Sequence, residues 1–87
     1  GGSTHSAAIE IREQSARFGA TTMAEKLYWS TMALRAYRRG DLAACRGRCS
    51  IVPELRLALS PSPPDVVITF QVIVEMVQAF SLTDLTV

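Results

Sequence analysis

The sequence predicts an all-α domain, a small bundle of four or five helices that contains an antiparallel helical hairpin. Polar residues recur at helical spacing within the most apolar stretch, residues 63–80. Thr22 and Glu25 stand three residues apart, as in a capping box that begins a helix. Only Gly40 and Asp41 separate two helical segments, so these segments must turn back on each other.

The chain is long enough for one hydrophobic core. It has 87 residues, of which 48% are hydrophobic, and its formal net charge is +1. We expect residues 1–5 to be a flexible end or a remnant of expression cloning, and residues 6–87 to form a single helical domain. The sequence has no initiating Met and no stop signal at its end, which suggests a piece of a longer chain.

The first two helices are expected over residues 6–18 and 22–39. We expect the helices over residues 22–39 and 63–80 to form the core, with those over residues 6–18 and 41–52 packed against them. In the first, Ile11 and Phe18 share an apolar face, and Gly19 supplies a stop. In the second, we expect Tyr28, Trp29 and Met32 to be core residues, since apolar side chains cover nearly all sides of its first three turns. We interpret the acidic side chains of both helices, Glu25 included, as solvated.

Asp41 is expected to cap a third helix over residues 41–52. Pro53 then either kinks this helix or begins a short separate one over residues 53–59, because proline removes an internal hydrogen bond. We favour the new start. Ser60-Pro61-Ser62-Pro63-Pro64 is too rich in proline to be helical throughout.

Cys45 and Cys49 lie four residues apart, which places both on one face of a helix where disulfide geometry is unfavourable. We interpret them as small buried hydrophobes in a reducing, intracellular compartment, the cytoplasm or nucleus. A metal site would need two further ligands, and the single histidine, His5, lies near the N-terminus. We therefore expect no metal and no cofactor.

The apolar stretch 63–80 is rich in β-branched residues, which favour a strand. However, Gln71, Glu75 and Gln78 form one narrow polar stripe that only a helix gives. Ser62 is its expected N-cap, with Pro63 at the first helical position. The stretch is too short and too polar for a membrane span. Such a helix must be covered by other helices or by a partner chain.

Residues 24–53 resemble a tetratricopeptide-repeat helical hairpin at its turn. The positions that match are Ala33, Tyr37, Gly40, Asp41 and Leu42. The first helix is longer than a repeat's, and no second copy follows. The resemblance implies a surface that binds peptides or other helices, without catalysis.

No catalytic constellation is visible, since the chain has one histidine, no glycine-rich phosphate loop and no nucleophile motif. We therefore expect a non-enzymatic protein–protein interaction or oligomerisation module, which binds a partner or itself through its apolar helix and an arginine-rich face. The candidate partner-binding residues are Arg35, Arg38, Arg39, Arg46, Arg48, Phe70, Ile73 and Val77.

Two alternatives remain open. The arginine cluster between Arg35 and Arg48 could bind nucleic acid, although the sequence pI of about 8.0 is below the value above 9 typical of such domains. Alternatively, the chain could be a structural segment of a larger helical scaffold that normally covers its apolar face.

Overall fold

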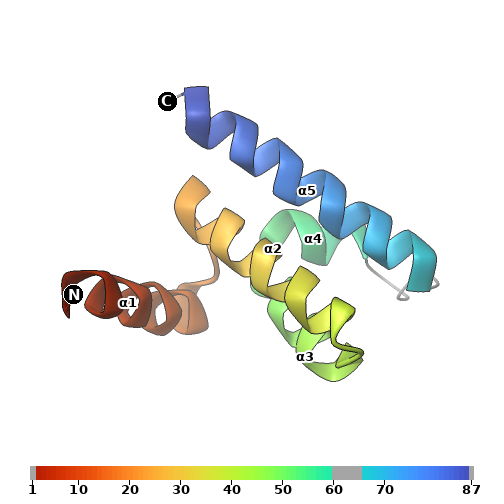
Figure 1. Cartoon of the computed structure of the whole chain (residues 1–87), viewed down its shortest axis with the longest axis horizontal. Coiled ribbons are helices and arrows are strands. Elements are labelled where there is room, and N and C mark those ends of the chain that lie inside the picture. Colours follow the sequence, from red (N-terminus) through yellow and green to blue (C-terminus); the bar gives the residue numbers. More distant parts are fainter. Residues whose placement is uncertain (1, 60–65, 87) are drawn as a thin grey trace.

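A computed structural model describes residues 2–59 and 66–86, with side chains described for 9–59 and 69–83. All regular structure in these ranges is helical, which confirms the predicted all-α class (Figure 1). The helices are α1 (Gly2–Phe18), α2 (Met23–Arg38), α3 (Leu42–Cys49), α4 (Pro53–Ala58) and α5 (Val66–Thr86).

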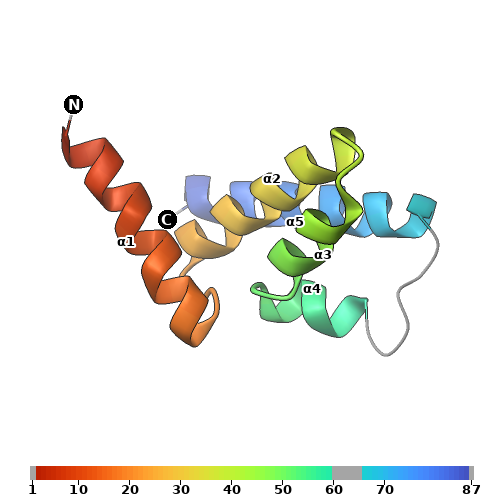
Figure 2. The same cartoon turned by 90° about the horizontal axis from the view of Figure 1, so that it is seen from below.

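Helix α2 is the centre of the packing. Helix α3 turns back against it and α5 runs alongside it in the opposite direction, while α4 packs on α5 (Figures 1 and 2). The Lys26 ammonium on α2 also donates a 2.9 Å hydrogen bond to the Glu54 carboxylate on α4. Helices α3, α4 and α5 thus all contact α2. This agrees with the predicted hairpin of α2 and α3 and with the prediction that other helices cover the apolar helix.

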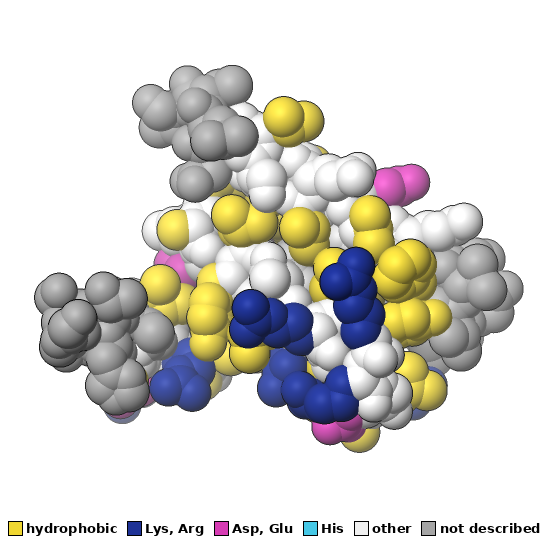
Figure 3. All heavy atoms as spheres, viewed as in Figure 1, with side chains coloured by type: hydrophobic (Ala, Val, Ile, Leu, Met, Phe, Trp, Pro, Cys, Tyr) yellow, Lys and Arg dark blue, Asp and Glu magenta, His cyan; other side chains and the backbone are white. Residues whose placement is uncertain are grey.

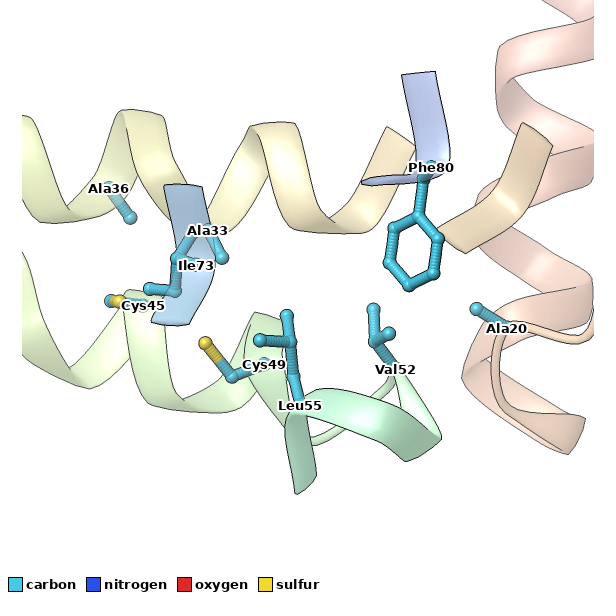
Figure 4. Close-up of a cluster of buried hydrophobic side chains, with 9 residues drawn as sticks. All are labelled: Ala20, Ala33, Ala36, Cys45, Cys49, Val52, Leu55, Ile73 and Phe80. Carbon is cyan, nitrogen blue, oxygen red and sulfur yellow. The ribbon is translucent and has the colours of Figure 1, made fainter. Parts of the chain in front are cut away.

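The core lies where α2, α3, α4 and α5 meet (Figure 4). Its largest fully buried apolar side chains are Leu55 of α4, Ile73 of α5 and Val52. On α2 the buried residues include Ala33 and Ala36, whose small side chains let the neighbouring helices approach closely. The remaining core residues are Ala20, Cys45, Cys49 and Phe80.

The predicted start and stop signals act as expected. The Thr22 hydroxyl accepts a hydrogen bond from the Glu25 amide, and the Glu25 carboxylate accepts one from the Thr22 amide, so the capping box is confirmed. Asp41 caps α3 by accepting from the Ala44 amide. Gly19 and Gly40 have φ of 77° and 81°, in the left-handed region that ends a helix.

Several boundaries differ from those predicted. Helix α1 begins at Gly2, so it includes residues that were expected to be a flexible end. Helix α3 ends at Cys49, and Val52 has extended backbone with Pro53 beginning α4, so the predicted new start is confirmed. Helix α5 continues to Thr86, since residues 81–86 contain neither glycine nor proline. Its predicted beginning, with Ser62 as cap and Pro63 next, lies outside the described residues.

Helix α1 does not pack along the bundle, which corrects the expectation that residues 6–18 lie against the core. It extends away from the other helices and meets them at its C-terminal end (Figures 1 and 2). Phe18 is 76% exposed, although its place on the apolar face of this helix predicted that it would be buried. The turn at Gly19 causes this: Ala20 is buried, and its amide donates to the Ile51 carbonyl over 2.9 Å.

Candidate protein-interaction surface

Three of the predicted site residues project together from the C-terminal half of α2 and its C-cap residue, Arg39. Arg35, Arg38 and Arg39 are all exposed, and their spacing of three and four residues places them on neighbouring positions of one helix face. We call these three residues the arginine surface. Figure 3 shows Lys and Arg side chains gathered over the region where α2 ends and α3 lies. Cationic side chains at this place are also stabilised by the negative, C-terminal end of the α2 dipole.

Most of this surface is available for binding. The Arg39 guanidinium lies 3.7 Å from the Asp41 carboxylate, and both side chains are about half exposed, so the pair is weak. Arg35 and Arg38 form no salt bridge with any carboxylate in the described residues. Their planar guanidinium groups therefore keep the donors that could bind an external carboxylate in bidentate fashion.

Arg48 has a structural contact. It is half-buried, and its Nη1 donates a 2.8 Å hydrogen bond to the backbone carbonyl of Met32, which ties α3 to α2. Since Met32 lies one helical turn before Arg35, the Arg48 guanidinium borders the arginine surface without belonging to its exposed part.

Arg46 is separated from this group. Residues two positions apart on a helix point to nearly opposite sides, and Arg48 points toward α2. The exposed Arg46 therefore projects from the other side of α3. Arg46 and Arg48 were expected to share one binding face because they are close in the chain. On α3, however, the helix period turns their side chains to different sides.

The apolar candidates on α5 face the chain's own core. Ile73 is fully buried among α2, α3 and α4, so it is corrected from a partner-binding residue to a core residue. Val77 is half-buried and packs against the core. Phe70 is also half-buried, with its ring centroid 5.1 Å from that of Tyr37 on α2. The polar stripe of Gln71, Glu75 and Gln78 faces solvent, as its spacing predicted.

A strip of half-buried apolar side chains runs between α2 and α5, beside the arginine surface. Tyr37 and Phe70 touch, Leu34 lies one turn back from Tyr37, and Val74 lies one turn on from Phe70. We call these four residues the α2–α5 seam. Figure 3 shows hydrophobic side chains gathered along the line where the two helices lie side by side. Arg38 adjoins Leu34, four residues away on α2.

Glu25 is a buried carboxylate, which corrects the expectation that its side chain is solvated. Glu25 is only 6% exposed and accepts hydrogen bonds from the hydroxyls of Ser15 at 2.8 Å, Thr22 at 2.9 Å and Thr21 at 3.4 Å. Burial raises its pKa, but the hydrogen bonds from Ser15, Thr22 and Thr21 together outweigh burial and lower it. The Thr22–Glu25 capping box pointed to this site, but nothing in the sequence linked it to Ser15.

The two cysteines are free and buried, as predicted. Burial raises the pKa of both thiols, that of Cys49 to about 12, so neither is an activated nucleophile. In the described residues, no three His, Cys, Asp or Glu side chains cluster closely enough to hold a metal ion. Nor does any helix in that part of the chain have the length and apolar character needed to cross a membrane.

No protein-family model, curated protein or solved structure matches this chain. The similarity of residues 24–53 to a tetratricopeptide hairpin therefore stays a prediction.

Proposed function

We propose that this protein is a non-enzymatic interaction module that binds an acidic segment of a partner protein through Arg35, Arg38 and Arg39. The observation that carries the proposal is a face with two exposed guanidinium groups that form no salt bridge with the carboxylates the structure describes, and a third that is only weakly paired. Guanidinium groups bind carboxylates with two parallel hydrogen bonds, and Arg is enriched where proteins associate.

A protein partner fits the charge distribution better than nucleic acid does. The formal net charge of the whole chain is only +1, and Arg46 projects away from the arginine surface. A phosphate backbone is bound by a wide basic surface, which releases many counterions. A short acidic segment needs only the few cations that α2 offers.

The test compares two double variants of equal net charge. Arg35→Glu/Arg38→Glu reverses the arginine surface, whereas Arg46→Glu/Arg56→Glu reverses two exposed arginines elsewhere. Binding is measured by fluorescence anisotropy with three labelled probes: a peptide rich in Glu and Asp, single-stranded DNA and duplex DNA. We expect the peptide to bind the native protein and the control, and to bind the first variant at least about tenfold more weakly, since two attractive pairs become repulsive.

Equal loss in both double variants would contradict the role of the arginine surface, since net charge alone would then explain binding. Tighter binding of DNA than of the acidic peptide, with a steep dependence on salt, would instead support the nucleic-acid alternative. A far-ultraviolet circular dichroism melt of each variant checks that the fold is retained.

A further inference from the structure

The α2–α5 seam places a strip of apolar side chains beside the arginine surface. The contact between Tyr37 and Phe70 marks one end of the seam, with ring centroids 5.1 Å apart. Because α2 and α5 are antiparallel, one turn away from this contact brings the chain to Leu34 on one helix and Val74 on the other. All four side chains are half-buried, so each has apolar surface covered on one side and solvated on the other.

Polar residues of different character border the seam. On the α2 side lie the arginines, with Arg38 adjoining Leu34. On the α5 side lies the exposed polar stripe of Gln71, Glu75 and Gln78, next to Phe70 and Val74. The surface therefore has an apolar centre, a cationic edge on α2 and, on α5, a polar edge whose one charged member, Glu75, is acidic and would repel the carboxylates of a bound segment.

We propose that the acidic segment binds as an amphipathic helix along the α2–α5 seam, with its apolar face on Leu34, Tyr37, Phe70 and Val74 and its carboxylates toward Arg35 and Arg38. This inference rests on the proposed function and adds the shape of the partner. A helix presents apolar residues at positions i, i+4 and i+7, which matches the one-turn spacing of the seam residues. An acidic flank beside that apolar face meets the cationic edge.

Val74 allows the apolar contribution to be tested apart from charge. It is half-buried and does not belong to the core cluster or to the side chains packed against it. Val74→Gln therefore leaves the core and the net charge unchanged. Leu57→Gln is the matched control, because Leu57 is 79% exposed on α4, outside the seam.

The experiment selects peptides from a displayed library of random 16-residue sequences, using the native protein and the Arg35→Glu/Arg38→Glu variant as targets. We expect the native protein to enrich acidic peptides with apolar residues at helical spacing, and the variant to lose them. The best selected peptide is then labelled and measured by anisotropy. Val74→Gln is expected to weaken its binding about fivefold or more, whereas Leu57→Gln leaves it unchanged.

The outcomes separate this inference from the proposed function. Enrichment of acidic peptides without apolar periodicity, together with unchanged binding by Val74→Gln, would overturn the helical mode and leave the acidic partner intact. Failure to enrich acidic peptides on the native protein would overturn both. Circular dichroism of the selected peptide, which should gain helix signal on binding, gives a second readout that does not depend on any variant of the protein.

Discussion

Leu55 and Leu57 lie two residues apart on α4 and provide a matched test of the fold. Leu55 is fully buried, whereas Leu57 is 79% exposed. Changing either to alanine alters helix propensity in the same short helix by a similar amount, so the difference between the two variants reports burial. A buried Leu→Ala change costs about 2–5 kcal/mol, through lost transfer free energy and the cavity left behind. An exposed one stays within about 0.5 kcal/mol.

The cost at Leu55 is a large part of the total, because a small domain is stable by only about 5–15 kcal/mol. With a shift of about 4–8 °C per kcal/mol for a domain of this size, Leu55→Ala should lower Tm by at least about 8 °C. The assay is unfolding of both variants by urea and by heat, monitored by circular dichroism. Equal destabilisation by the two variants, or a native-like melt for Leu55→Ala, would refute the placement of α4 under α5.

Three further predictions concern the turn, the buried carboxylate and the thiols. Gly40→Ala should destabilise the fold by about 1–2 kcal/mol, because φ is 81° with open space around it, whereas helical Gly47→Ala should stabilise it by about 0.5–1 kcal/mol; thermal melts that move in the same direction would contradict this. The pKa of folded Glu25 lies below its usual 4.5, so its stabilisation is complete above that pH and is lost as pH falls through the folded pKa. The unfolding free-energy gap between the native protein and Glu25→Gln should therefore narrow in acid, and a constant gap down to about pH 3 would argue against it. Cys45 and Cys49 should react with Ellman's reagent only as urea unfolds the chain, and immediate labelling of both thiols without urea would show that they are not buried.

The sequence alone determined the helices and most of their ends. Local rules suffice for these, because a capping residue, a left-handed glycine or a proline acts within one turn of the backbone. Thr22 with Glu25, Gly40 with Asp41, and Pro53 therefore marked boundaries that the structure confirms. The polar stripe of α5 likewise decided helix over strand, since its period is a property of the segment itself.

Only the tertiary structure decided which side chains face the core and which face solvent. Ile73 is buried because α2 and α4 cover it, and Arg46 is separated from Arg48 because α3 points its second arginine at a carbonyl of α2. Glu25 is buried because Ser15 reaches it across a turn, ten residues away in the chain. Each outcome depends on contacts between segments, and helix periodicity specifies the face of a residue without specifying its neighbour.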